Sequence, residues 1–407
     1  MGYKFTIFED ILSRIFMMFT SQVSVLITLP FIAASLDIDI FGKICACFII
    51  SQLGWTLSEW GTFNYAIERW SYLKSDQIKN KFFCSIFFVN LFLSLIYCSF
   101  VYFFISLGII NIPIEYMLIT TPTIIFGAIY PLWIFQITKK ISKLLIPTII
   151  ARFLYVIVII VFVKDNSDDL LILTSQALCI SSITLISFIR LFNFFSIEKF
   201  YFDLQNIYSL FKKSTTFFIA SISLVHINSC WAFVLSLTSN FSLIALYSFA
   251  DQIFRGMASL NVIIAQSLRI NLFNQSNKNT LKNILFFVFL YFIFGLISFL
   301  FFEFISFSFK NSFYFDSFAI IKIMFIGSLM QGVILFFNYP LIGKIFGTIF
   351  LNRLGFIFLF IHFIFMLFWL SYSQNLKLMC LLILLVFILQ ILLYFNLLVK
   401  KQTLLRY

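Results

Sequence analysis

Long apolar segments alternate with short polar breaks along the whole chain. The breaks include KSDQIKNK at 74–81, DNSDD at 165–169 and NQSNKN at 274–279. An apolar helix of about 20 residues crosses a hydrocarbon core of roughly 30 Å, so the pattern predicts a membrane protein that is entirely α-helical. Twelve spans are expected, at about 11–33, 44–65, 82–107, 116–137, 144–163, 170–192, 214–237, 242–267, 281–306, 317–340, 354–370 and 377–399.

Composition supports this fold class. The chain has 407 residues, of which 62% are hydrophobic and only 11% are charged, which excludes a soluble domain and a secreted disulfide scaffold. The net charge of +12 is explained by topology, because most Lys and Arg residues lie in alternate breaks, as Lys81, Lys143 and Lys213 do. The positive-inside rule then places both termini in the cytoplasm. No nucleic-acid partner is expected.

The spans divide into two equal sets. An even number of spans in each half gives both halves the same orientation, as in parallel repeats, so an N-terminal lobe at 1–200 and a C-terminal lobe at 201–407 are predicted. Polar residues recur at matching intervals on the first and seventh spans. They form a predicted stripe of Ser21, Ser24, Thr28, Ser223 and His226. Two interpretations stay open for this stripe, namely small-residue helix contacts and a polar pathway shared by the two lobes.

Ionisable residues within the spans are candidate functional groups, because burying a charge in a membrane is costly. Arg152 lies about eight residues into the fifth span, too deep to reach the interface comfortably. Asp251 and Arg255 are four residues apart and can form an ion pair on one helix face. Glu59, in the second span, and Asp251 are candidates for ion coupling or for ion pairing.

Motifs for metal binding and catalysis are weak. Asp37 and Asp39 form a D-x-D pair in the first outer loop, but no outer loop is long enough to build an acceptor groove. The seven cysteines lie in or beside apolar spans, without the ligand clusters that a metal needs. We therefore expect no catalytic residue, no metal site and no cofactor.

Several segments together resemble the Wzx-type O-antigen and polysaccharide flippases of the multidrug/oligosaccharidyl-lipid/polysaccharide (MOP) exporter superfamily. The element of Pro131, Trp133 and Phe135 is the most specific, and one departure from the family pattern is Thr138 followed by Lys139 and Lys140. The segments that carry the resemblance are TLPFIAASLDIDIFG at 28–42, LSEWGTFNYAIER at 57–69, PLWIFQITKK at 131–140, KKSTTFFIASI at 212–222 and ALYSFADQIFRGMASL at 245–260.

The resemblance implies two six-helix lobes around a central cavity that opens alternately to either side of the bacterial inner membrane. The implied substrate is an undecaprenyl-diphosphate-linked oligosaccharide unit for O-antigen, lipopolysaccharide or capsule, and the implied partners are membrane lipids and the polysaccharide polymerase machinery. Arg152 and Arg255 are the buried cations that could meet the diphosphate, with Arg14 at the cytoplasmic mouth. Trp60 and Trp133 are among the aromatic residues that could stack on sugar rings.

Two other functions remain open. A small-molecule or multidrug antiporter of the same fold would use Asp251 or Glu59 to exchange protons or sodium for a cationic solute. An O-antigen polymerase or membrane glycosyltransferase would need a large outer catalytic loop. Cations outnumber unpaired acids within the predicted cavity, and this balance favours an anionic, lipid-linked substrate.

Overall fold

The computed structural model is helical, with no strand among the residues that it describes. Those residues are 2–138, 140–194, 201–224, 227–238, 240–252, 254–255, 285, 288–289, 292–293, 315–337, 342–346, 348–372 and 375–404. The chain forms two compact units, Met1–Ala245 and Leu246–Tyr407. The predicted lobe boundary between residues 200 and 201 stays a prediction.

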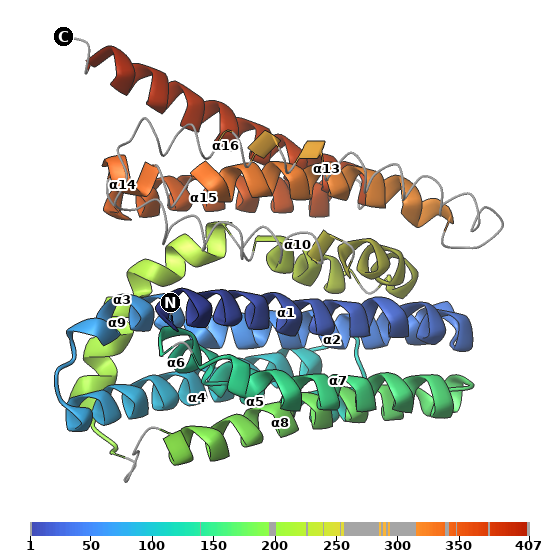
Figure 1. Ribbon diagram of the computed structural model, residues 1–407. Coiled ribbons are helices and arrows are strands. Elements are labelled where there is room, and N and C mark those ends of the chain that lie inside the picture. Colours follow the sequence, from blue (N-terminus) through green and yellow to red (C-terminus); the bar gives the residue numbers. More distant parts are fainter. Residues whose placement is uncertain are drawn as a thin grey trace. The chain divides into compact units, whose positions relative to one another are not determined.

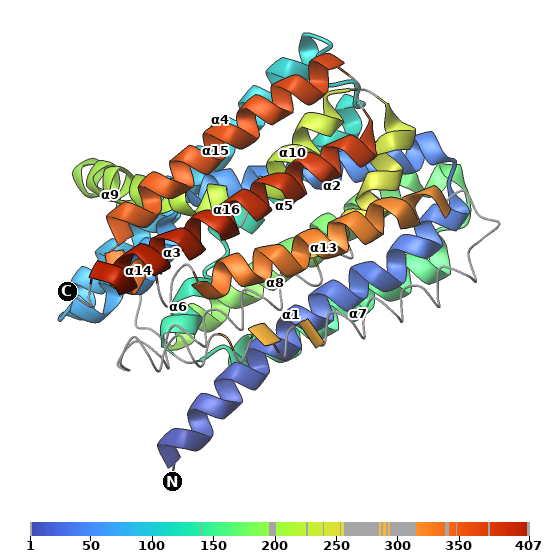
Figure 2. The same ribbon diagram turned by 90° about the horizontal axis from the view of Figure 1, so that it is seen from above.

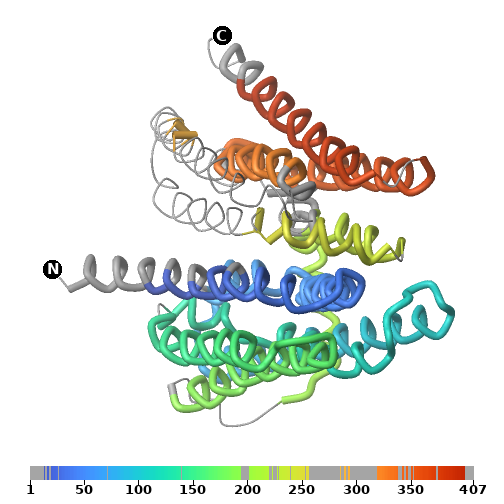
Figure 3. Tube along the Cα trace, turned by 90° about the vertical axis from the view of Figure 1, so that its right-hand side faces the viewer, coloured from blue at the N-terminus to red at the C-terminus, as the bar shows by residue number. Residues whose placement is uncertain are grey.

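The first unit is a bundle of long helices that lie roughly along a common direction (Figures 1 and 3). Figure 2 shows α1 running beside α7, and α2 also packs against α4 and α5. The helices are α1 (Gly2–Ser35), α2 (Ile38–Glu59), α3 (Thr62–Arg69), α4 (Asp76–Ser106), α5 (Ile114–Ile129), α6 (Leu132–Ile137), α7 (Ser142–Phe162), α8 (Asp169–Phe194), α9 (Leu204–Leu224) and α10 (Ile227–Ser236), with short 3₁₀ turns η1 (Trp70–Tyr72) and η2 (Asn166–Asp168).

The described part of the second unit contains α13 (Phe315–Phe337), α14 (Gly343–Phe346), α15 (Thr348–Tyr372) and α16 (Leu376–Leu404). Helices α15 and α16 form an antiparallel hairpin (Figure 2), and α16 also packs against α13. These helices match the predicted spans at 317–340, 354–370 and 377–399. The predicted span at 281–306 and the end of the one at 242–267 lie largely outside the described residues.

Eight helical segments of the described residues are long and apolar enough to cross a membrane. Their outward faces carry large apolar side chains, such as Phe153 at 62% exposed and Leu178 at 70% exposed. Their inward faces carry small polar ones, such as Ser94 and Thr184, which are almost completely buried. This distribution suits a bilayer, where lipid solvates the apolar surface and small residues allow helices to approach closely.

Two of the predicted spans are each broken into two helices. The span at 44–65 is interrupted where Trp60 (φ 43°) and Gly61 (φ 67°) adopt left-handed conformations between α2 and α3. The span at 116–137 is interrupted between α5 and α6, because Pro131 disfavours a helical conformation at Tyr130, whose ψ is 116°. Each break turns the chain at one end of a membrane helix.

The α2–α3 break docks onto α9. The Trp60 ring stacks on Phe218 at a centroid distance of 3.9 Å and on Phe211 at 5.0 Å. Its Nε1 donates a hydrogen bond of 3.0 Å to Oγ1 of Thr215. A Cβ atom at Gly61 would lie 2.3 Å from the backbone nitrogen of Phe218, so glycine permits both the left-handed turn and the close approach of α9.

Candidate functional site

The interior of the first unit holds an arginine among polar groups. Arg152 of α7 is half-buried, and its Nε is buried without a hydrogen-bond partner in the described part of the chain. It is close enough to interact electrostatically with Tyr130 at the α5–α6 break, with Tyr155 of α7 and with Cys179 of α8. No acidic residue of the described chain forms an ion pair with it. Arg152 therefore carries an uncompensated charge inside the helix bundle.

Tyrosine hydroxyls surround this arginine and link four helices. Tyr155 lies three residues after Arg152, one turn along the same face of α7, and its hydroxyl is near Thr28 of α1. The Tyr130 hydroxyl is near Ser187 of α8 and Thr148 of α7. The cluster is held by the tight α1–α7 and α7–α8 packing and by the break at Pro131, which places Tyr130 between helices.

A buried acceptor near the same face of α8 also lacks a partner. The Oε1 atom of Gln176 has no hydrogen bond among the described residues, and Gln176 is one helical turn from Cys179. A buried polar atom without a partner costs about 1–3 kcal/mol. An unmatched donor on α7 and an unmatched acceptor on α8 are therefore groups that a polar ligand or water could satisfy.

The predicted polar stripe is placed only in part. On α1, Ser21 is half-buried and Ser24 and Thr28 are buried. The Thr28 hydroxyl donates to the Ser24 carbonyl at 3.0 Å, and Thr28 lies near Tyr155 of α7. The described half of the stripe thus contributes to the α1–α7 contact and reaches the Arg152 cluster.

Three further predicted residues are described incompletely or not at all. Arg14 lies in α1 and Ser223 in α9, but their side chains are outside the described part of the structure. His226 lies outside the described residues altogether. Their proposed roles at the cytoplasmic mouth and on the stripe stay predictions.

The second unit contains the predicted ion pair. Arg255 Nε contacts Oδ2 of Asp251. The Asp251 side chain is only 3% exposed and that of Arg255 is 13% exposed. The other carboxylate oxygen of Asp251, Oδ1, has no hydrogen-bond partner in the described chain. This geometry favours ion pairing over a free acid at Asp251, and it leaves Arg255 with its charge compensated.

The aromatic candidates lie in packed environments. Trp133 is 3% exposed and meets Trp70 edge-on at 5.5 Å, while Trp60 fills the joint with α9. Both rings contact protein side chains, which assigns them to packing rather than to stacking on sugar. Glu59 ends α2 immediately before Trp60, and its carbonyl accepts a 2.6 Å hydrogen bond from Thr62.

The D-x-D segment joins two loops. The Asp37 backbone nitrogen donates to Oδ1 of Asn166 at 2.8 Å, and Nδ2 of Asn166 donates back to the Asp37 carboxylate at 2.6 Å. In the same turn, hydrogen bonds from Ser167 lower the pKa of the exposed Asp165 carboxyl below its usual value. Within the described residues, no three His, Cys, Asp or Glu side chains cluster closely enough to hold a metal ion.

Sequence reasoning missed the polar residues that organise these sites. Asn90 of α4 is buried, donates to the Ala128 carbonyl at 2.9 Å and accepts from Thr62 at 3.0 Å. Its position inside an apolar span was a usable signal, since intramembrane polar residues usually bond between helices. Tyr155 could have been found from its spacing to Arg152. Tyr130 could not, because its placement depends on the tertiary consequence of the Pro131 break.

These features define a multi-pass helical membrane protein of the transporter type, with a half-buried cation in its first helical unit. The profile of a family described as polysaccharide biosynthesis protein matches residues 8–268. The chain belongs to this family, which is the family of the MOP-superfamily polysaccharide flippases such as Wzx. The resemblance inferred from the sequence motifs is thereby confirmed. No curated protein sequence matches the chain.

Proposed function

We propose that the protein is a flippase that moves undecaprenyl-diphosphate-linked oligosaccharide units from the cytoplasmic to the periplasmic leaflet of a bacterial inner membrane. Twelve helices in two six-helix lobes would enclose a central cavity and alternate between inward-open and outward-open forms. Both termini would be cytoplasmic, and the product would serve O-antigen, lipopolysaccharide or capsule assembly. Family membership and the run of apolar helices support this proposal.

The chemistry of the substrate sets the requirement that the site must meet. A diphosphate and a sugar chain cannot cross hydrocarbon unaided, because an isolated charge in a medium of low dielectric constant is strongly unfavourable. A fixed cation and hydroxyl groups within the protein would replace the lost water, while the polyprenyl tail stays in lipid. Arginine suits this role because its planar guanidinium can bind two phosphate oxygens at once.

The observation that carries the proposal is the uncompensated charge of Arg152. Its Nε lacks a partner, and the Tyr130 and Tyr155 hydroxyls lie near it. A cation kept inside the membrane without a carboxylate has no structural benefit to offset its burial. An anionic substrate that enters transiently would supply the missing partner.

The antiporter alternative depends on the acids. In the second unit Asp251 is paired with Arg255, whereas an exchanger for a cationic solute needs an acid that is free in one state. Glu59 forms no ion pair within the described chain and is the acid on which that alternative rests. Loss of transport in Glu59→Gln together with full transport in Arg152→Ala would favour the antiporter.

The test replaces Arg152 by Ala and by Lys and measures surface polysaccharide normalised to folded protein. Losing a charge-assisted hydrogen bond costs about 1.5–3 kcal/mol, which corresponds to roughly 10- to 150-fold slower transport. Lys should restore only part of the activity, since it lacks the planar fork. Arg190→Ala, which removes a half-buried cation of α8, is the matched control and should transport normally.

Stability separates this role from a structural one. Removing a half-buried cation whose Nε has no partner should leave the free energy of unfolding unchanged or raise it, since no bond in the described chain is lost. The proposal therefore expects Arg152→Ala to be stable and inactive. Full activity of Arg152→Ala at wild-type abundance would overturn it.

A further inference from the structure

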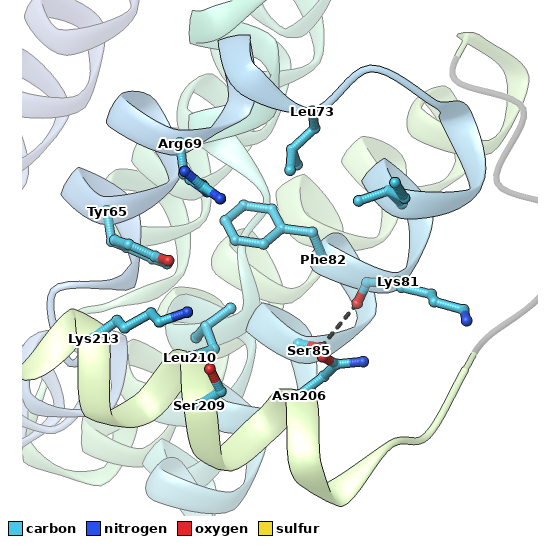
Figure 4. A pocket seen from close by; sticks show the side chains of 11 residues that line it. Tyr65, Arg69, Leu73, Lys81, Phe82, Ser85, Asn206, Ser209, Leu210 and Lys213 are labelled. Atoms are coloured by element: carbon cyan, nitrogen blue, oxygen red, sulfur yellow. Dashed lines mark hydrogen bonds between the residues drawn. The ribbon is translucent and has the colours of Figure 1, made fainter.

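A half-open pocket of about 310 Å³ lies in the first unit, and none of the residues that line it belongs to the Arg152 cluster. It is formed by α3, by Leu73 in the turn before α4, by the first turns of α4 and by α9. Figure 4 shows Arg69, Tyr65 and Lys213 along one side, with the Phe82 ring and Leu210 in the centre. Segments from both halves of the chain sequence thus enclose one pocket.

The pocket is cationic. Arg69, Lys81 and Lys213 line it, and no Asp or Glu does. None of the three forms an ion pair with a described residue. Arg69 lies 6.0 Å from the ring centre of Tyr72, and Lys81 lies 5.8 Å from that of Tyr201. In Figure 4 the Lys81 ammonium extends away from the others, so Arg69 and Lys213 are the cations that face one ligand.

Three acids lie near the pocket without lining it. Glu68, next to Arg69 on α3, is close enough to interact electrostatically with Tyr65. Asp203, just before α9, accepts hydrogen bonds from the backbone nitrogens of Gln205 and Asn206 at 3.0 and 3.2 Å and from Nδ2 of Asn206 at 2.7 Å. Asp76 pairs with Lys79 at 3.5 Å. The lining of the pocket therefore carries three cationic side chains and no carboxylate, with Glu68 and Asp203 beside it.

The lining is both polar and apolar. The Tyr65 and Ser209 hydroxyls can donate hydrogen bonds to an anion between Arg69 and Lys213, while Phe82 and Leu210 supply apolar surface. A small soluble anion would gain no binding energy from contact with these apolar side chains. A phosphate that is esterified to a lipid can use both the polar and the apolar side chains, since its headgroup is charged and its chains are apolar.

The position of the pocket also points to lipid. Arg69 is the last residue of the span Ile38–Arg69, and the next span begins at Asp76. The pocket therefore lies beside α3, which follows the end of α2, and at the start of α4, which is where lipid phosphates are expected if these helices cross a bilayer. Basic pockets between transmembrane helices at this depth bind anionic headgroups.

We propose that this pocket binds the phosphate of a membrane lipid, with Arg69 and Lys213 as the charge partners and Tyr65 as a hydrogen-bond donor. The phosphate has two possible sources, an anionic phospholipid or the diphosphate of a polyprenyl-linked unit arriving for transport. The second source rests on the proposed flippase function, whereas the first does not. In either case the bound lipid bridges α3 and α9.

Binding of defined lipids to the purified full-length protein by native mass spectrometry tests the proposal. The probes are phosphatidylglycerol, undecaprenyl diphosphate and phosphatidylcholine, a lipid without net charge. A cation near a membrane surface contributes about fivefold to the affinity for an anionic lipid, so Arg69→Ala with Lys213→Ala should weaken binding of an anionic probe roughly 25-fold. The control is Lys74→Ala with Lys212→Ala, which removes the same charge from exposed positions outside the pocket.

The two sources give different results. A loss confined to phosphatidylglycerol identifies a resident phospholipid, and a loss for undecaprenyl diphosphate identifies the substrate headgroup. Equal weakening by the pocket and control pairs, or no preference for anionic over neutral lipid, would overturn the proposal. Tyr65→Phe keeps the ring and should weaken binding about threefold even if the double variant folds poorly. Lipid binding is measured separately from transport, so the two proposals can fail independently. If the pocket binds no anionic lipid but the protein still flips its substrate, only this inference is refuted. If the pocket binds lipid but the protein does not flip substrate, only the proposed function is refuted.

Discussion

The joint between the second membrane helix and α9 yields a prediction that separates two physical effects. At Gly61 an alanine would need a left-handed backbone (φ 67°), and its Cβ would lie 2.3 Å from the Phe218 nitrogen. The backbone conformation alone costs roughly 1–2 kcal/mol. Relieving the overlap by moving α9 costs a further 1–3 kcal/mol or so. Gly61→Ala should therefore lower the free energy of unfolding by about 2–5 kcal/mol.

Gly108 provides the matched control. Its φ of 70° is nearly the same, but a Cβ there would meet no atom within 4 Å. Gly108→Ala should therefore lose only the backbone contribution of roughly 1–2 kcal/mol. The assay is unfolding of the purified variants in mixed micelles with increasing SDS, followed by tryptophan fluorescence. Equal losses in the two variants would refute the close contact of Gly61 with α9.

Two further predictions concern the loops. Replacing Asp37 and Asp39 together by Ala should leave surface polysaccharide largely intact. Stability should fall by only about 1 kcal/mol, because the one hydrogen bond lost, from Nδ2 of Asn166 to the Asp37 carboxylate, is exposed, while the backbone bond of Asp37 remains. Abolished polysaccharide at normal protein level would favour an enzyme. Reporter fusions after Lys81 and Lys213 should report cytoplasm, and a fusion at 168 should report periplasm, since basic breaks stay inside. If any of these fusions reproducibly reported the opposite side of the membrane, the predicted topology of two six-helix lobes would be refuted.

The helical fold could be predicted from the sequence because the membrane allows few alternatives. Backbone groups in hydrocarbon must bond within their own segment, so each long apolar segment predicts a helix. Eight described helical segments overlap predicted spans, whereas α9 (Leu204–Leu224) begins ten residues before the predicted span at 214–237. The breaks were harder to place. Pro131 predicts the break between α5 and α6. The break at Trp60 and Gly61 depends on docking against α9, where Trp60 bonds to Thr215, 155 positions away in the sequence.

The candidate site was predictable only where a charge stood alone in an apolar segment. Arg152 and the pair of Asp251 and Arg255 were found this way, because burial cost makes such residues exceptional. The Tyr130 and Tyr155 hydroxyls were not, since tyrosine in a membrane protein is common at interfaces and gains its role from tertiary placement. The pocket of Arg69 and Lys213 could not be predicted from the sequence either. Basic residues in the polar segments between spans are already explained by membrane topology, so they give no separate signal of a binding site.

The most direct test of the central claim is the leaflet in which lipid-linked oligosaccharide units accumulate when the gene is deleted. The units can be labelled from each side of the membrane with a reagent that does not cross it. A flippase predicts that full-length lipid-linked units build up on the cytoplasmic leaflet, and that wild-type protein but not Arg152→Ala returns them to the periplasmic leaflet. Units that reach the periplasmic leaflet normally and cap the surface lipid singly would contradict the claim and indicate a lost polymerase.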